Sequence, residues 1–304
     1  MTQESHRPRR LGTSAAAGLL LAFSAASLLA QEQQQRQPSP TQLAMREATR
    51  LDPQGRHAES RAIFQRLIDS ASTPRELASA RRAMARSFGF DRNCGEAMRY
   101  ELMVIDYWKT REAEEPQNAF YQQGEMANEG ARICIDAGAL DSAEKYYKLG
   151  SELGLKEPEP KTHPKSLWDY RLAHAMGRIE ARRGNKAEAL RHVALARQAL
   201  DSDTAMARQQ ERFFPYLEGY VALYTDDIAT AEAKFKQMLA MRGNDRDPFM
   251  HALLGMTYEK QGRMAEARDM YTKAYDLSDG HNPPAAFARP FAREKLGLKV
   301  PDAP

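Results

Sequence analysis

The sequence lacks the patterns that mark most enzymes and nucleic-acid-binding proteins. Its 304 residues include two Cys and seven His, and no His stands in an HExxH pattern or at zinc-binding spacing from Cys or carboxylates. It has no phosphate-binding Gly loop and no nucleophile elbow. His57, His192 and His251 stand among charged or small neighbours, as surface or packing residues do. We expect no catalytic residue, no cofactor and no metal.

The first thirty residues have the layout of a secretory signal peptide. Arg7, Arg9 and Arg10 make a basic start, residues 14–29 are apolar and uncharged, and Ala30 suits a cleavage site. The apolar run is shorter than the about 20 residues of a membrane span. No N-glycosylation sequon occurs. We therefore expect export to a bacterial periplasm or outside the cell, with an uncleaved inner-membrane anchor as the alternative.

Without this segment the chain has almost no excess of either charge. Its removal takes away three Arg and one Glu and lowers the formal charge from +3 to +1. This balance argues against nucleic acid or a membrane surface as the main partner. Residues 31–40 are polar and contain Pro, so we expect a flexible leader there.

A pattern of three residues recurs along the rest of the chain. A small residue is followed twelve positions later by another small residue and four positions beyond that by a large one. The copies are Gly255–Ala267–Tyr271, Gly219–Ala231–Phe235, Gly177–Ala189–Val193, Ala131–Ala143–Tyr147, Ala48–Ser60–Phe64 and Ala85–Ala97–Glu101. Their first members lie 36 to 46 residues apart. Such a period indicates stacked repeats, which usually bind rather than catalyse.

The last copy shows what each repeat contains. The spacing predicts a helix over 248–260, a turn at Gly262 and a second helix over 264–277. Pro283 and Pro284 forbid its continuation. Gly255 and Ala267 are expected to be small because the two helices cross closely there, and a larger side chain would cost roughly 1–3 kcal/mol.

This unit resembles the tetratricopeptide repeat. The residues that carry the resemblance are Leu254, Gly255, Tyr258, Gly262, Ala267, Tyr271 and Ala274. The resemblance extends unevenly over residues 41–280. The residue at the turn between the two helices is Gly in four units (Gly55, Gly138, Gly184 and Gly262) and is Arg92 or Asp226 in the other two. The resemblance implies an all-α fold, a right-handed superhelical stack (α-solenoid) of about six helix hairpins.

The chain divides at its Pro-rich segments. We expect front units over 41–155, a Pro-rich insertion over 156–166, back units over 167–280, and a capping helix with a tail over 281–304. A second insertion is expected around 109–123. Trp108 and Trp168 flank the insertions and are expected to pack at these joints.

The two Cys fall on neighbouring helices of the implied stack. Cys94 lies near the start of the second helix of unit two, and Cys134 lies late in the first helix of unit three. Because successive helices run antiparallel, these two positions are neighbours. In the oxidising compartment of an exported protein we predict a disulfide, with two buried thiols as the alternative.

The resemblance also implies a concave groove lined by the first helix of each unit. The positions that face it by alignment are Arg82, Arg86, Asn128, Arg132, Arg171, His174, Arg178, Tyr216, Tyr220 and Tyr224. Arg side chains bind carboxylates and Tyr supplies contact area, so we predict a ligand with an acidic segment and an apolar end. The alternative is that the Arg are solvated and the Tyr pack between repeats.

We therefore predict an exported, non-enzymatic adaptor or scaffold that binds a protein or peptide segment. One alternative is a structural or assembly subunit of a cell-envelope complex. Another is an enzyme or substrate-handling module with a site between the front and back units. The sequence leaves the oligomeric state open.

Overall fold

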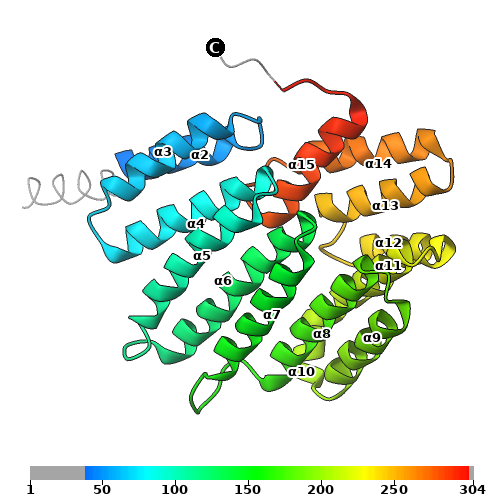
Figure 1. Ribbon diagram of the computed structural model, residues 1–304, viewed down its shortest axis with the longest axis horizontal. Helices are drawn as coiled ribbons and strands as arrows, with labels where there is room; N and C mark the ends of the chain where they lie inside the picture. Colours follow the sequence, from blue (N-terminus) through cyan, green and yellow to red (C-terminus); the bar gives the residue numbers. More distant parts are fainter. Residues whose placement is uncertain (1–37, 301–304) are drawn as a thin grey trace, which may run out of the picture. The chain divides into compact units, whose positions relative to one another are not determined.

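The structure, a computed structural model, describes residues 38–300, and the predicted signal peptide and most of the predicted leader lie outside them (Figure 1). Throughout the described range the regular secondary structure is helical. The helices are α2 (Pro40–Leu51), α3 (His57–Asp69), α4 (Pro74–Phe90), α5 (Cys94–Lys109), α6 (Pro116–Asp136), α7 (Leu140–Leu155), α8 (Lys165–Arg182), α9 (Lys186–Asp201), α10 (Thr204–Gln210), the 3-10 helix η1 (Glu211–Phe213), α11 (Phe214–Tyr224), α12 (Ile228–Ala240), α13 (Pro248–Lys260), α14 (Met264–Leu277) and α15 (Pro283–Leu296).

Consecutive helices pair as hairpins, and each hairpin packs against the next. The most extensive pairings within hairpins are α6 with α7, α8 with α9 and α13 with α14, followed by α4 with α5 and α11 with α12, and α5 packs as extensively on α6 of the next hairpin (Figure 1). The predicted all-α solenoid is confirmed. None of the helices within residues 38–300 is both long enough and apolar enough to cross a bilayer.

All six predicted turn positions adopt left-handed backbone. The φ angle is 87° at Gly55, 81° at Gly138 and Gly184, and 74° at Gly262. The two non-Gly turn residues follow the same path, with φ of 55° at Arg92 and 61° at Asp226. Left-handed backbone brings Cβ close to the following carbonyl oxygen, so these two residues are strained where Gly would not be.

Two of the small residues that begin the repeat pattern pack against the large residue of their own unit. A Cβ atom on Gly255 would lie 2.5 Å from Cε1 of Tyr271, and one on Gly219 would lie 2.8 Å from Cε1 of Phe235. The expectation of a close helix crossing is thus refined: in these units an aromatic ring from the second helix lies on the first helix and leaves no room for a side chain.

The extra residues around 109–123 lengthen a helix, because α6 begins at Pro116. Proline suits the first turn of a helix, since its φ is already helical and its missing N–H would have no partner there. Trp168, at the start of α8, is fully buried. Cβ atoms on Gly124 and Gly154 would lie 2.3 and 2.1 Å from its indole ring, so both glycines make room for it.

The C-terminal helix does more than cover the end of the stack. α15 packs against α13 and α14, as expected of a capping helix, and also against α4 and α6 of the front units. Nε of Arg289 and Nη2 of Arg293 donate to the carbonyl oxygen of Pro53, at 3.0 and 3.1 Å. Residues 44–300 therefore close on themselves through α15, and α15 continues across Pro290 without ending there.

Candidate functional site

A cavity of about 310 Å³ lies among α6, α7, α8, α11 and the start of α15. Six of the ten predicted groove residues line it, from three helices: Asn128, Arg132, Arg171, His174, Arg178 and Tyr216. The other lining residues are Glu125, Glu129, Tyr147, Tyr170, Gln210, Phe213, Pro283 and Pro284.

Arg178 of α8 lies at this cavity with only neutral hydrogen-bond partners. The residue is 5% exposed. Its Nη1 donates to the hydroxyl of Tyr216 and its Nη2 to the hydroxyl of Tyr147, both at 2.9 Å, and its Nε donates to the carbonyl oxygen of His174 at 3.3 Å. These bonds fix the orientation of the guanidinium but leave its positive charge without a contacting carboxylate.

Arg132 of α6 is the second cation of the cavity. Its Nε and Nη2 are buried and have no hydrogen-bond partner among residues 38–300. The guanidinium lies 4.7 Å from the ring centroid of Phe249, which is a cation–π distance. Buried donors are nearly always bonded in folded proteins, so these two atoms are the ones most available to an incoming acceptor.

The acidic residues of the cavity wall are already paired. Glu129 accepts from Nη2 of Arg82 at 2.6 Å and from Nη2 of Arg86 at 3.0 Å. Burial opposes ionisation of Glu129, but the hydrogen bond and charge of Arg86 outweigh it, so its pKa lies below the usual range. Glu125 accepts from Nη1 of Arg171.

Asp136, one turn beyond Arg132 on α6, is a buried carboxyl on which the charges of both cavity cations act. Burial raises its pKa to about 6, although the charges of Arg132 and Arg178 oppose this shift. Among residues 38–300, Asp136 interacts with the two guanidinium groups through their charges and forms no ion pair with either. The cavity therefore keeps two guanidinium groups without a direct anionic partner.

The remaining walls are neutral. Burial first, and then the charge of Arg178, lower the pKa of His174 well below its usual value, so its imidazole is uncharged at neutral pH. Burial raises the pKa of Tyr216 to about 12, so its phenol keeps its proton. The hydroxyl of Tyr170 donates to the carbonyl oxygen of Gln210 at 3.4 Å.

The other four predicted groove residues lie elsewhere. Arg82 and Arg86 hold Glu129 from α4. Tyr220 is buried, and its hydroxyl accepts from Nη1 of Arg182 at 3.3 Å. The ring of Tyr224 packs against that of Tyr220, with centroids 4.6 Å apart and the planes tilted by 37°. For these two tyrosines the alternative interpretation, packing between repeats, describes what the structure shows.

Several lining residues were not among the predicted groove positions. Tyr147 belongs to the repeat pattern as a packing residue, and its hydroxyl reaches the cavity from α7. Pro283 and Pro284 were expected only to end a helix. Their place at the cavity follows from the return of α15 toward α4 and α6, which no local sequence pattern encodes.

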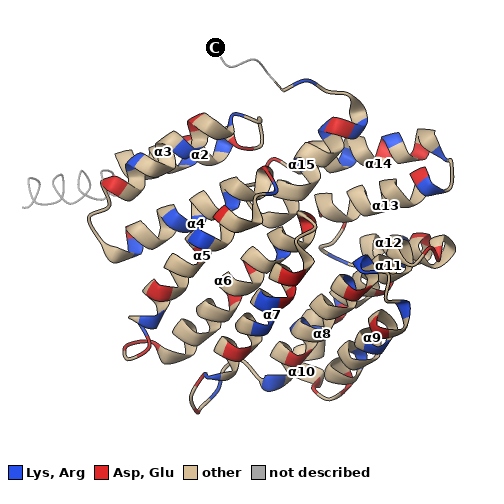
Figure 2. Ribbon diagram, viewed as in Figure 1, with Lys and Arg blue, Asp and Glu red and all other residues tan. Residues whose placement is uncertain are grey.

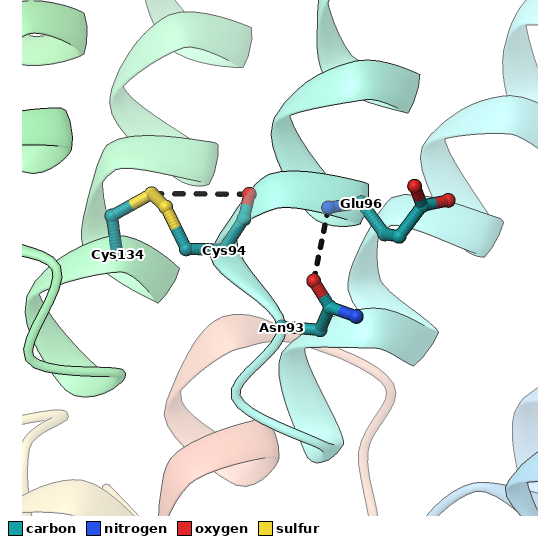
Figure 3. The surroundings of a disulfide bond; sticks show 4 residues. All are labelled: Asn93, Cys94, Glu96 and Cys134. Carbon is teal, nitrogen blue, oxygen red and sulfur yellow. Dashed lines mark hydrogen bonds between the residues drawn. A yellow bond between two sulfur atoms is a disulfide. The ribbon is translucent and has the colours of Figure 1, made fainter.

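Cys94 and Cys134 are joined by a disulfide, with Cα atoms 4.7 Å apart (Figure 3). Cys94 begins α5, directly after Asn93, whose side chain accepts from the backbone N of Glu96 at 3.1 Å (Figure 3). Cys134 lies two residues from Arg132 on α6. The bond therefore fixes the helix that carries one of the two cavity cations.

Comparison with known proteins identifies one segment. Residues 250–281 match the model of the tetratricopeptide repeat, and they include most of α13 and all of α14. A search of curated proteins found no match. The resemblance on which the sequence analysis relied is thus confirmed for this hairpin. The chain contains a tetratricopeptide repeat within an all-α solenoid, an architecture that presents surfaces for binding other proteins.

Proposed function

We propose that this chain is an exported adaptor or scaffold that binds a segment of a partner protein at the cavity between α6, α8 and α11, without catalysing a reaction. The observation that carries the proposal is the gathering of six predicted groove residues at one cavity. Positions 46 residues apart, such as Arg132 and Arg178, come together there because the repeats stack.

The arrangement of the cavity side chains favours binding. Arg178 is held by the hydroxyls of Tyr147 and Tyr216, and Arg171 is held by Glu125. Side chains that are already ordered lose little conformational entropy when a partner arrives, so more of the contact energy remains as affinity. Lys and Arg alternate with Asp and Glu over the helices (Figure 2), which suits a partner chosen by local contacts more than by overall charge.

Two features support export. Residues 1–30 have the basic start, apolar run and small final residue of a signal peptide. The pair Cys94–Cys134 is suited to an oxidising compartment. Cell fractionation and N-terminal sequencing test this part of the proposal: the expected product is soluble and begins at Gln31. A full-length chain in the membrane fraction would support the uncleaved anchor instead.

Site-specific photo-crosslinking tests the binding proposal. A photoreactive phenylalanine at Phe213 should crosslink a partner at the cavity, whereas the same group at Leu190, which is 50% exposed on α9, should not. The Phe213 crosslink should disappear when Arg132 is changed to Gln. Equal products at both positions, or a product at Phe213 that is indifferent to Arg132→Gln, would contradict the proposal. A crosslink to a second copy of the chain would favour the assembly subunit.

A further inference from the structure

We infer that the cavity binds one carboxylate carried on an apolar group, placed between the guanidinium groups of Arg132 and Arg178. The inference rests on the proposed function, since it names the ligand chemistry of the same cavity. The carboxylate is either the end of a polypeptide or a small free acid. It differs from the expected acidic segment, which would bring several negative charges.

The Arg residues in and beside the cavity differ in whether they have a carboxylate partner. Arg82, Arg86 and Arg171 each have a carboxylate partner on α6. Arg178 has only hydroxyl and carbonyl partners, and Arg132 has two buried nitrogens with none. The one buried carboxyl that acts on both cations, Asp136, is also acted on by Arg92 and Arg182, so positive charge remains in excess. A bound carboxylate would offset this excess and accept hydrogen bonds from the free N–H groups.

The acidic residues of the cavity limit the ligand to one negative charge. Glu125 and Glu129 also line the cavity, and each already accepts hydrogen bonds from Arg. A second carboxylate on the ligand would meet these anions rather than a free cation. The like charges would repel it, so an acid-rich segment is a poor fit.

The aromatic walls of the cavity suit an apolar group on the ligand. The walls beside the two cations are Tyr147, Tyr170, Tyr216 and Phe213, with His174 between Tyr170 and Tyr216. These rings give apolar contact area. A volume of about 310 Å³ is at the small end of ligand cavities, so it suits a single side-chain-sized group.

The start of α15 forms one wall of the cavity. Pro283 and Pro284 line the cavity at the first turn of this helix, and α15 packs against both α6 and α4. An extended segment that ran along the first helices of successive repeats would meet this wall. A chain end or a small acid needs to enter the cavity only once.

Titration calorimetry on the exported chain without residues 1–30 tests the inference, with N-acetylphenylalanine as the probe and its C-terminal amide as the matched neutral compound. We expect the acid to bind and the amide to bind at least about tenfold more weakly, because charge-assisted hydrogen bonds are the strongest of the site. Arg132→Gln should weaken the acid about tenfold or more. Arg191→Gln, on exposed α9, should leave it unchanged.

Folding controls keep the result interpretable. Arg132 forms no ion pair with the described residues, so Arg132→Gln should keep the melting temperature of the parent chain. Tyr216→Phe is a second variant, which removes one hydroxyl that holds Arg178 and should weaken the acid but not the amide. Equal affinity for acid and amide, or no binding of the acid at about 10 mM, overturns the inference.

A second comparison distinguishes a polypeptide end from a small free acid as the source of the carboxylate. A short peptide that ends in Phe with a free carboxylate is compared with N-acetylphenylalanine. Tighter binding of the peptide indicates a chain end, and equal binding indicates a free acid; both results support the carboxylate site. If the acid fails while the Phe213 crosslink persists, the carboxylate inference is lost and the proposed partner-binding function stands.

Discussion

The front hairpins, α2 to α7, and the back hairpins, α8 to α14, are packed by different chemistry. In the back, Gly219 lies under the ring of Phe235 and Gly255 under the ring of Tyr271. In the second unit of the front, the position of the large residue is Glu101, which is fully buried. The repeat pattern thus keeps its positions along the chain, but in this one front unit a buried carboxyl stands where the other front units have Phe64 and Tyr147.

Buried polar groups also join the front hairpins. The carboxylate of Asp52 accepts from the hydroxyls of Ser60 and Ser87 at 2.9 Å and is bonded to His57 at 2.9 Å and to His281 at 2.8 Å. Burial alone would raise the pKa of Asp52, but the bonds from His281 and His57 lower it. A disulfide between α5 and α6 adds a covalent link.

The comparison teaches that the stacking geometry persists when a buried carboxyl replaces the aromatic ring, even though neither oxygen of Glu101 has a hydrogen-bond partner among residues 38–300. Residues 250–281, which match the tetratricopeptide repeat, lie in the back half where the Gly–aromatic contact is intact. The front is built from the same hairpins but is stabilised by hydrogen bonds, ion pairs and a disulfide. The cavity lies where the two halves meet, among α6, α7, α8 and α11.

Phe235→Ala should have the largest effect on the back half. The ring is fully buried, and its loss leaves a void over Gly219 that a rigid helix pair fills poorly. We expect the free energy of unfolding to fall by about 3–5 kcal/mol, measured by urea denaturation. Leu190→Ala, at an exposed position, should change it by less than about 0.5 kcal/mol. If Phe235→Ala lowered the free energy of unfolding by less than about 1 kcal/mol, the Gly–aromatic contact would not be what stabilises the back hairpins.

Removal of the disulfide should have the largest effect on the front half. Cys94→Ala with Cys134→Ala opens a loop with a separation of 40 residues, which lowers the stability by up to about 4 kcal/mol in the chain-entropy account. Reductant should destabilise the parent chain and leave the double variant unchanged. Intact mass after alkylation gives the independent check, since two modified thiols in the unreduced chain would rule the bond out.

Glu101 should make the front half sensitive to rising pH. Burial, and then the charge of Glu129, raise its pKa well above the usual value of 4.5, so the native state holds a proton that the unfolded state releases. Stability therefore falls as pH rises above about 4.5, by at most about 1.4 kcal/mol per pH unit. Glu101→Gln, which mimics the protonated form, should remove this loss.

The measurement is urea denaturation at pH 5 and pH 7. The free energy of unfolding of Glu101→Gln, relative to that of the parent chain, should rise from pH 5 to pH 7. The matched variant Glu96→Gln, on the exposed side of α5, should keep the same difference from the parent chain at both pH values. A constant difference at both pH values would mean that Glu101 is charged in the native state. In the back half, His174 should act in the opposite direction, since its lowered pKa makes stability fall as pH drops below about 6.5.

The hairpins and their turns could be predicted from sequence because each is local. The left-handed turns at Gly55 and Asp226 follow from the twelve-residue spacing, which fixes where one helix must end and the next begin. Stacking at a regular period also brings residues on equivalent faces together, which is why Arg132, Arg178 and Tyr216 share a cavity.

The return of α15 could not be predicted in this way. The contact between His281 and Asp52 joins positions 229 residues apart, and its geometry depends on the summed rotation of every intervening hairpin. The same limit explains why Arg82 and Arg86 were assigned to the groove. Their partner Glu129 is on another unit, so the ion pairs that occupy them depend on packing rather than on spacing.

The turns give the smallest and sharpest test, because the two halves should respond alike. Asp226→Gly relieves left-handed strain at φ 61° and loses only an exposed ion pair with Lys260, so we expect a gain of about 0.5–1 kcal/mol. Arg92→Gly, in the front, should gain a similar amount from φ 55°. Gly262→Ala should lose about 1 kcal/mol, although nothing lies within 4 Å of its added Cβ, because the strain comes from the backbone alone. Thermal melting of the three variants measures this, and a stabilised Gly262→Ala would show that steric space, not φ, governs these turns.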